Sequence, residues 1–191
     1  MIVPTLAIVS GPPCSGKSTL AQGLARELGW PLVAKDAFKE PLFEVLDAGD
    51  PGASRRLSEL AFAAQFAVAR ALLETGSPVL LEGNFRRDAH GPAIMALAGT
   101  GDGRLLQLAC TAPAGVLAAR RRDRALSGMR HPGHGDGATA VPVPEAGLYA
   151  PLPDIPTRMV DTSRDLTREQ WAELLALLGA DPNVLPATPG R

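Results

Sequence analysis

The feature that most constrains the fold is the segment GPPCSGKS at residues 11–18, which matches the pattern G-x-x-x-x-G-K-[ST]. It follows the apolar run TLAIVS at residues 5–10 and precedes a segment with leucines at helical spacing. When a buried strand, a glycine-rich turn and a helix follow one another, the turn forms a loop whose backbone N–H groups converge on phosphate oxygens. The segment therefore predicts an α/β fold that binds a nucleotide.

Each position of this loop has an expected role. Gly11 and Gly16 let the backbone curl, and the following helix adds the positive end of its dipole. Lys17 is expected to reach the β- and γ-phosphates, and Ser18 to offer a hydroxyl to Mg²⁺. The residues expected to contact the nucleotide are Gly11, Pro13, Cys14, Ser15, Gly16, Lys17, Ser18 and Thr19.

Strand-like and helical patterns alternate along the rest of the chain. Strand-like runs occupy residues 31–35, 78–81, 104–110 and 157–160, and helical patterns follow Asp36 and occupy 54–74, 92–98, 113–126 and 167–178. This alternation predicts a three-layer α/β/α fold with a parallel five-stranded sheet. We expect one domain over residues 1–180 and a C-terminal tail over residues 181–191.

Composition narrows the classes of function. The 191 residues carry a formal net charge of −1, which favours neither nucleic acid nor an anionic membrane as a partner. No apolar run approaches the ~20 residues that cross a bilayer, and the N-terminus lacks the pattern of a signal peptide. Two cysteines, Cys14 and Cys110, suggest neither a disulfide framework nor a zinc site. We therefore expect a cytoplasmic, reduced enzyme.

With GPPCSGKST at residues 11–19 and Lys35-Asp36 after the second strand, the sequence resembles the P-loop small-molecule kinases. This group includes AAA_33, zeta-toxin, chloramphenicol-phosphotransferase, gluconate-kinase and polynucleotide-kinase-like proteins, and the resemblance spans most of residues 5–178. It implies a P-loop NTPase fold that uses ATP and Mg²⁺ to transfer the γ-phosphate to a hydroxyl of a small molecule.

Asp36 is the candidate catalytic base. It follows the second strand, and ligands of such sheets gather beyond the carboxyl ends of the strands. The resemblance implies an acidic residue here that accepts the proton of the acceptor hydroxyl. A simple helix cap at Asp36 would also explain the residue. Lys35 and Lys39 flank it, and either could bind an anionic substrate or belong to a solvated helix face; Lys39 is the one we assign to the substrate.

Glu82 lies where the third strand ends. The resemblance implies an acidic residue there that supports Mg²⁺, although many of these proteins carry Asp, so substrate contact or a plain charged strand end stays open. Asn84, Phe85 and Arg86 follow on the same edge and are expected to contact the acceptor.

Residues 120–156 are expected to form a mobile lid, because arginines lead into a stretch rich in Gly and Pro. We assign Arg120, Arg124 and Arg130 to the transferred phosphate, and His131 and His134 to the substrate. A solvated helix face, a surface loop or, for the histidines, a metal are the alternatives.

The resemblance places Asp161 and Thr162, after the last strand, beside the adenine. Two other functions remain open, a polynucleotide 5′-kinase and a nucleotide-binding switch without kinase activity. The neutral charge balance argues against the first, and the arginine-rich helix against the second. The absence of the N-K-x-D pattern favours ATP over GTP.

Overall fold

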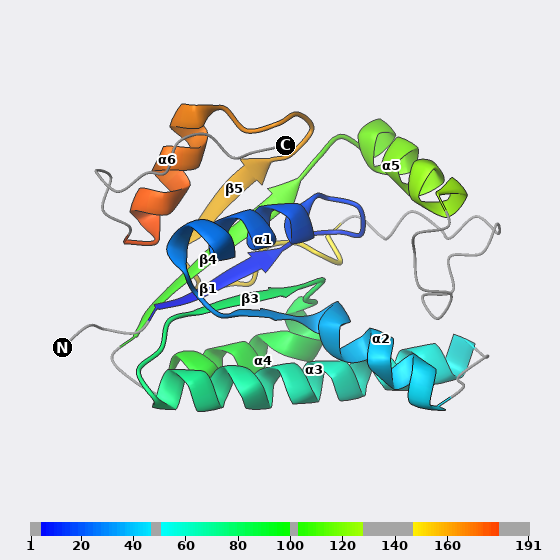
Figure 1. The fold of residues 1–191 in the computed structure, drawn as a ribbon, viewed down its shortest axis with the longest axis horizontal. Coiled ribbons are helices and arrows are strands. Elements are labelled where there is room, and N and C mark those ends of the chain that lie inside the picture. The colour runs from blue at the N-terminus through cyan, green and yellow to red at the C-terminus, as the bar shows by residue number, and fades with distance from the viewer. Residues whose placement is uncertain (1–4, 47–50, 100–102, 128–146, 180–191) are drawn as a thin grey trace.

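The computed structural model describes residues 5–46, 51–99, 103–127 and 147–179, which form a parallel sheet between two layers of helices (Figure 1). The strands are β1 (Thr5–Ser10), β2 (Leu32–Ala34), β3 (Val79–Gly83), β4 (Arg104–Thr111) and β5 (Thr157–Asp161). The helices are α1 (Lys17–Leu28), α2 (Lys35–Leu46), α3 (Pro51–Glu74), α4 (Arg87–Ala98), α5 (Ala114–Leu126) and α6 (Arg168–Leu177). The strand order is β2-β3-β1-β4-β5, with every pairing parallel, which confirms the predicted three-layer fold.

Strand β1 occupies the middle of the sheet because both of its faces are apolar. All six of its residues are buried. It pairs with β3 on one side and β4 on the other, so that Ile8 lies opposite Leu81 and Gln107. A strand buried on both faces is typical of parallel sheets covered by helices. The phosphate loop, residues 11–18, therefore begins at the end of a fully buried strand.

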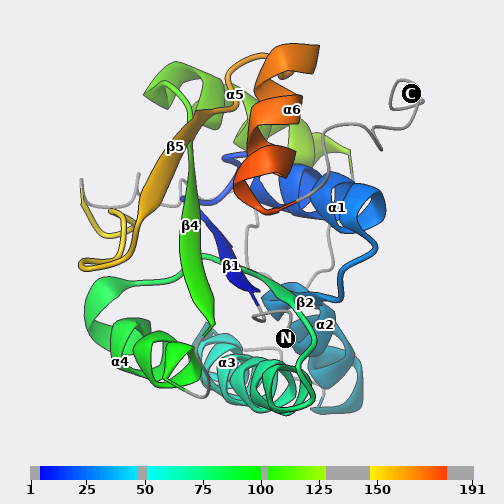
Figure 2. The same ribbon diagram turned by 90° about the vertical axis from the view of Figure 1, so that its left-hand side faces the viewer.

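The two faces of the sheet are covered by different helices (Figure 2). On one face, α1 and α6 pack against alternate residues of the central strands, and Val9, Leu24 and Leu175 belong to this cluster. On the other face, Ile8 and Leu81 pack against side chains of α3 and α4. No helix in the described part of the chain is both long and apolar enough to span a membrane.

Residues 147–156, the last part of the predicted lid, pack onto the core. Leu152 and Ile155 are buried in the same cluster as α3 and α4. The Leu152 N–H donates to Oε1 of Gln107 at 2.9 Å, and Nε2 of the same side chain donates to the Ser10 hydroxyl at 2.6 Å. A closing segment would therefore end before Gly147; residues 128–146 lie outside the described part of the chain.

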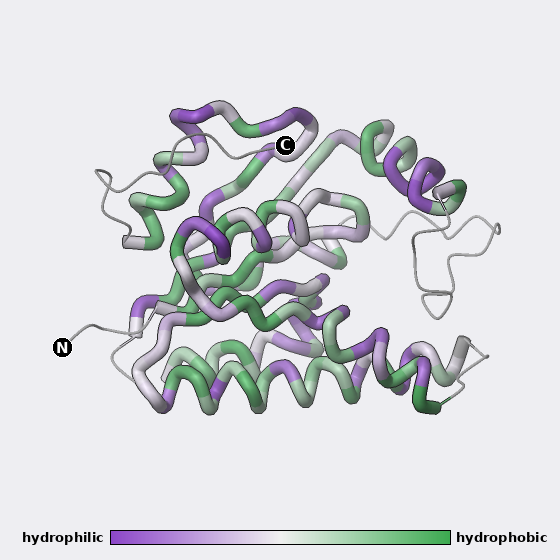
Figure 3. The backbone as a smooth tube through the Cα atoms, viewed as in Figure 1, coloured by the Kyte–Doolittle hydropathy of each residue, from purple (hydrophilic) through white to green (hydrophobic). Residues whose placement is uncertain are grey.

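The hydropathy pattern separates α5 from the other helices (Figure 3). Its second half is hydrophilic, and none of its residues is buried. Without an apolar face to bury, α5 depends on polar contacts for its position. Those contacts involve the phosphate loop and are described below.

The entry into α2 differs from the prediction. Strand β2 ends at Ala34 and the helix begins at Lys35, so Asp36 lies in the first turn and the N-cap assignment was wrong. The chain passes from strand to helix without a turn that could hold a cap. Pro41 lies inside α2.

The bounds of β3 and α4 also differ from the prediction. Strand β3 continues through Glu82 and Gly83, two residues beyond the predicted end at residue 81. Helix α4 starts at Arg87, five residues before the predicted start at Pro92. Proline is tolerated in the first turns of a helix, so it was a poor guide to the boundary.

Candidate functional site

The phosphate loop joins β1 to α1, and its backbone leaves no room for side chains at two positions. Gly11 has φ +150°, and a Cβ there would lie 2.5 Å from the carbonyl oxygen of Cys110 on β4. Gly16 has φ +77°, and a Cβ there would lie 3.3 Å from Cβ of Thr162. Both positions therefore require glycine, as a backbone that wraps closely around a ligand would.

Ser15 supplies an observation that fits a phosphate at this loop. Its side chain is fully buried, and its hydroxyl has no hydrogen-bond partner among the described residues. Leaving a buried donor unsatisfied costs free energy, so such atoms call for an explanation. A phosphate oxygen held by the loop would accept this hydrogen bond.

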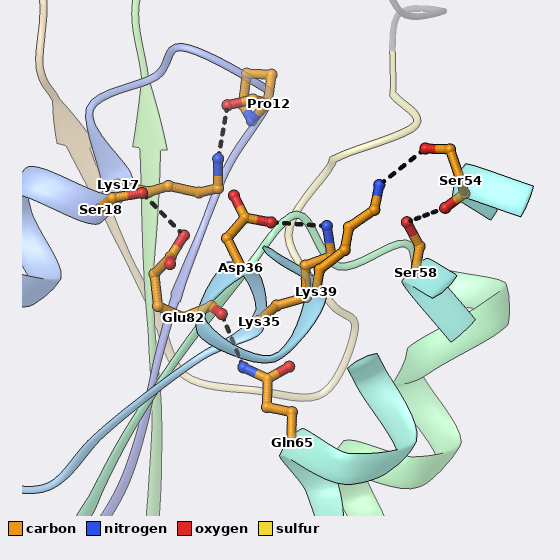
Figure 4. A network of polar contacts seen from close by, with 10 residues as sticks. All are labelled: Pro12, Lys17, Ser18, Lys35, Asp36, Lys39, Ser54, Ser58, Gln65 and Glu82. Atoms are coloured by element: carbon orange, nitrogen blue, oxygen red, sulfur yellow. Dashed lines mark hydrogen bonds and ion pairs between the residues drawn. The ribbon is translucent and has the colours of Figure 1, made fainter. Parts of the chain in front are cut away.

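Lys17, the first residue of α1, is the cation of the loop. Its ammonium donates to the Pro12 carbonyl at 3.5 Å (Figure 4). Burial lowers the pKa of Lys17, while the carboxylates of Glu82 and Asp36 act in the opposite direction. A desolvated cation at the mouth of a phosphate loop gains favourable energy when phosphate replaces the lost water.

Glu82 faces the start of α1 because β3 pairs directly with β1. Its partner in the register is Val9, two residues before the loop begins. The Ser18 hydroxyl donates to Oε1 of Glu82 at 3.3 Å. Burial raises the pKa of Glu82, and Lys17 offsets part of that rise. Two hard oxygen atoms this close together are the kind of donor that Mg²⁺ takes from proteins.

Asp36 enters the same site from α2. Its carboxylate accepts a hydrogen bond from Nζ of Lys35 at 2.8 Å. The Asp36 side chain is 51% exposed, whereas that of Lys35 is 8% exposed. The carboxylate is thus held by a buried cation and remains open to the pocket. In Figure 4 it points into the space between Lys17 and Lys35.

A pocket of about 180 Å³ connects these groups. Its lining is mostly polar and comes from the loop, α2, α3, β3 and α5: Pro13, Lys17, Ser18, Lys35, Asp36, Lys39, Ser58, Glu82, Gly83, Asn84 and Arg124. The structure therefore brings together the predicted base, the predicted metal ligands, and the predicted substrate residues Lys39, Glu82 and Asn84. Among the described residues, no cluster of three or more His, Cys, Asp or Glu side chains could hold a metal by itself.

Helix α3 forms the far wall of the pocket. Nζ of Lys39, a residue only 5% exposed, donates to Oγ of Ser54 at 3.1 Å. Ser58 lies one turn further along α3, and its hydroxyl donates to the Ser54 carbonyl at 3.1 Å. The long apolar helix predicted from the sequence thus also carries hydroxyl groups at the site.

Gln65 is a residue that sequence reasoning missed. It is fully buried in α3, and its Nε2 donates to the carbonyls of Val33 at 2.7 Å and Glu82 at 2.8 Å. One amide therefore ties α3 to β2 and β3 next to the pocket. A lone glutamine within the apolar stripe of a helix was the available signal, because a buried polar side chain needs partners.

Arg120 contacts the back of the phosphate loop. Its guanidinium donates to the Cys14 carbonyl at 3.5 Å and to the Thr162 carbonyl. The Thr162 hydroxyl in turn donates to the carbonyls of Ser15 and Thr111. These bonds position α5 and the end of β5 against the loop, whereas Arg124, one turn later, lines the pocket.

Several predicted site residues lie away from the pocket. Phe85 is 2% exposed and packs into an aromatic cluster with Phe62 and His90, with 5.7 Å between the ring centroids of Phe85 and Phe62. The backbone N–H of Arg86 donates to Nδ1 of His90 at 2.8 Å, and burial lowers the pKa of His90 to about 4.

The other predicted site residues lie either on the surface or outside the described part of the chain. Thr19 is exposed on α1, and the exposed Asp161 accepts a hydrogen bond from the Ser163 N–H at 2.8 Å. The remaining predicted contacts, Arg130, His131 and His134, lie outside the described residues.

Comparison with known proteins gives a family and a fold. Residues 6–139 match the model of the AAA_33 family, described as an AAA domain. A "putative kinase" from Chloroflexus aurantiacus J-10-fl is 34% identical, with a TM-score of 0.80 over 92% of this chain and 97% of that one. The search of curated proteins found no match.

Two more distant structures share the fold. A sugar kinase from a Janibacter species superposes with a TM-score of 0.63 at 20% identity, covering 96% of this chain and 99% of that one. The APS kinase of Mycobacterium tuberculosis, solved with AMPPNP and APS, superposes with a TM-score of 0.58 at 19% identity, covering 94% and 100%.

Proposed function

Because this chain belongs to the AAA_33 family of P-loop domains, we propose that it is a kinase that transfers the γ-phosphate of ATP to a hydroxyl group of a small molecule. The observation that carries the proposal is the position of Asp36, whose exposed carboxylate shares one pocket with Lys17, Ser18 and Glu82. In this proposal Asp36 is the proton acceptor, and its place in the same pocket as the groups suited to the nucleotide phosphates supports that role.

The phosphates have a specific set of partners in this proposal. The backbone of the loop, the Ser15 hydroxyl and the Lys17 ammonium bind phosphate oxygens, and the dipole of α1 adds to the attraction. Ser18 and Glu82 would hold Mg²⁺, which neutralises charge on the phosphates when bound. Arg124 contributes a further cation at the pocket.

The acceptor hydroxyl lies next to Asp36 in this proposal. The carboxylate takes the hydroxyl proton while the acceptor oxygen forms its bond to the γ-phosphorus and the bond to the β-phosphate oxygen breaks, leaving ADP. Lys35 holds and orients the Asp36 carboxylate through their 2.8 Å contact. Gln65 fixes the backbone that carries Glu82 and so maintains the spacing of the two carboxylates.

The direct test is a panel of metabolites and antibiotics incubated with ATP and Mg²⁺ and analysed for new phosphorylated masses. Asp36→Asn keeps the size of the side chain and removes the base. We expect its turnover to fall about 10²- to 10⁴-fold, the usual contribution of a general base. Its affinity for a non-hydrolysable ATP analogue, measured by calorimetry, should stay near that of the wild type.

Asp88→Asn is the matched control, because it removes an exposed carboxylate in the first turn of α4. It should leave turnover unchanged. ATP hydrolysis without phosphorylation of any acceptor would contradict the proposal and favour a nucleotide-binding switch. A loss of ATP affinity in Asp36→Asn would show that Asp36 serves the nucleotide and not the acceptor.

A further inference from the structure

Gln107 is a polar residue buried in the middle of the sheet. It lies on β4 opposite Ile8 of β1, and it is 1% exposed. Burying an amide costs free energy unless its polar atoms find hydrogen-bond partners. The partners of this amide lie 97 and 45 residues away in the sequence, so Gln107 joins two distant segments of the chain.

One side of the amide binds the residue that precedes the phosphate loop. Nε2 of Gln107 donates to Oγ of Ser10 at 2.6 Å, and Ser10 is 3% exposed. Ser10 is the last residue of β1 and is followed directly by Gly11, the first residue of the loop. The side chain of Gln107 thus contacts the point at which the strand passes into the loop.

The other side of the amide binds the segment that leads into β5. The Leu152 N–H donates to Oε1 of Gln107 at 2.9 Å, and the Thr157 hydroxyl donates to the same oxygen at 3.4 Å. The backbone N–H of Gln107 donates to the Pro156 carbonyl at 2.8 Å. Together with the burial of Leu152 in the core, these hydrogen bonds hold the segment on β4.

The start of the phosphate loop is tightly packed. A Cβ at Gly11 would lie 2.5 Å from the carbonyl oxygen of Cys110 and 2.6 Å from Oγ of Ser15. A displacement of Ser10 would therefore move Gly11 against the Ser15 hydroxyl, which has no hydrogen-bond partner in the described part of the chain and binds a phosphate oxygen in the proposed function. Close-packed contacts of this kind transmit a displacement to their neighbours.

We infer that Gln107 is a positioning residue for the nucleotide, because its amide links residues 152–157 to Ser10, so that docking of this segment and binding of the nucleotide stabilise each other. The inference rests on the nucleotide binding within the proposed function and adds a residue outside the pocket. Coupling between two sites is reciprocal. If the docked segment favours the conformation of the loop that binds the nucleotide, the nucleotide favours the docked segment by the same factor.

Gln107→Met keeps the length of the side chain and removes the amide. The affinity for the non-hydrolysable ATP analogue, measured by calorimetry, should fall about fivefold or more, which is the lower end of the usual coupling between two sites. Gln22→Met makes the same chemical change at an exposed position of α1 and should leave the affinity unchanged. Equal affinities of Gln107→Met and the wild type would overturn the inference.

Hydrogen exchange of the Leu152 amide tests the same link in the opposite direction. In the wild type, the ATP analogue should slow this exchange about fivefold or more beyond its effect on the amides of α4, which packs on the same face of the sheet. Ser10→Ala breaks the link on the side of the loop and keeps the groups that join Leu152 to Gln107. In this variant the additional protection of Leu152 should disappear.

A purely structural role for Gln107 makes a different prediction. Gln107→Met would then unfold at a lower temperature, yet the folded variant would bind the analogue like the wild type, and the nucleotide would protect Leu152 no more than it protects α4. Should Gln107→Met fail to fold, the exchange measurements decide. The inference fails if the nucleotide gives Leu152 no additional protection in the wild type, or if that protection persists in Ser10→Ala.

These measurements separate the inference from the proposed function, since none of them requires an acceptor. Binding of the analogue that depends on Gln107, without phosphorylation of any acceptor by ATP, would retain the inference and refute the kinase. Phosphorylation of an acceptor, with unchanged affinity for the analogue in Gln107→Met, would retain the kinase and refute the inference. A wild-type protein that does not bind the analogue would refute both.

Discussion

The phosphate loop and the pocket wall made by Lys35, Asp36, Lys39 and Ser58, here called the acceptor wall, are built in opposite ways. The loop is one continuous segment, and its backbone shapes it: Gly11 and Gly16 adopt positive φ where a side chain would collide with β4 or Thr162. The acceptor wall joins side chains from α2 and α3, and Gln65 anchors α3 to the neighbouring strands. A site shaped by backbone conformation can be recognised from the spacing of its residues in the sequence. A site built from side chains of several elements forms only after long-range packing.

The largest effect should come from Lys17→Met, which tests the loop alone. We expect affinity for the ATP analogue to fall about a thousandfold, since charge-assisted bonds to two phosphates are lost. The nucleotide-free protein should instead unfold at a higher temperature. Burial lowers the pKa of Lys17, so its charge costs stability below that pKa, and methionine removes the cost.

Calorimetry and thermal unfolding check the two halves of this prediction. Unchanged nucleotide affinity would mean that Lys17 does not serve the phosphates. A lower unfolding temperature would mean that the contacts of Lys17 with Pro12, Glu82 and Asp36 outweigh its burial, so the loop would also depend on side chains.

Gln65→Met should have an intermediate effect and tests the wall. It leaves two buried carbonyls, those of Val33 and Glu82, without this donor, which should lower the free energy of unfolding by about 2–4 kcal/mol. Acceptor turnover should decline more than nucleotide affinity, because the anchor joins α3 to the strands behind the wall. Urea titration and steady-state kinetics measure both quantities.

Gln22→Met is the control, since it makes the same chemical change at an exposed position of α1. It should leave stability and kinetics near those of the wild type. If Gln65→Met weakened ATP binding as much as acceptor turnover, the two regions would share their support and the contrast between them would fail.

The smallest effect concerns Glu82, where the loop and the acceptor side of the pocket meet. Burial raises its pKa in the folded protein above the ordinary value of 4.5. The protonated form is therefore favoured by folding: this contribution is fully present below pH 4.5 and is lost as the pH rises through the folded pKa. Glu82→Gln should be more stable than the wild type at neutral pH, and the difference should shrink as the pH falls toward 4.5.

Thermal unfolding of the nucleotide-free proteins across this pH range checks the sign. A stability difference that does not vary with pH would show that Glu82 does not titrate differently in the folded and unfolded states. Metal-dependent nucleotide binding should weaken in Glu82→Gln, and this separates its stability role from its proposed Mg²⁺ role.

The sequence predicted the framework because the determinants are local. The pattern at residues 11–18, with an apolar strand before it and leucines at helical spacing after it, specified β1, the loop and α1. The placement of Asp36 and Glu82 at the carboxyl ends of strands was sufficient to predict that they would share an edge of the sheet, and both line the pocket.

Other parts of the site had no local signal. Gln65 sits in an apolar stripe, and its partners lie 32 and 17 residues away in sequence. Phe85 follows the end of β3, yet its ring turns into the core. Phe62 of α3 and His90 of α4 contact it there. Arg120 was predicted to contact phosphate, whereas in the structure it contacts a carbonyl of the phosphate loop.

The contacts that hold the phosphate loop in place also determine when it can adopt its final structure during synthesis. The Thr162 hydroxyl meets the Ser15 carbonyl across 147 residues, and Arg120 meets the Cys14 carbonyl across 106. A ribosome releases the loop long before it releases these partners. A nascent chain therefore carries the complete motif but lacks these supporting contacts until residues 120 and 162 have been synthesised. Substitutions that slow the docking of β5 would lengthen the interval in which the loop is unsupported.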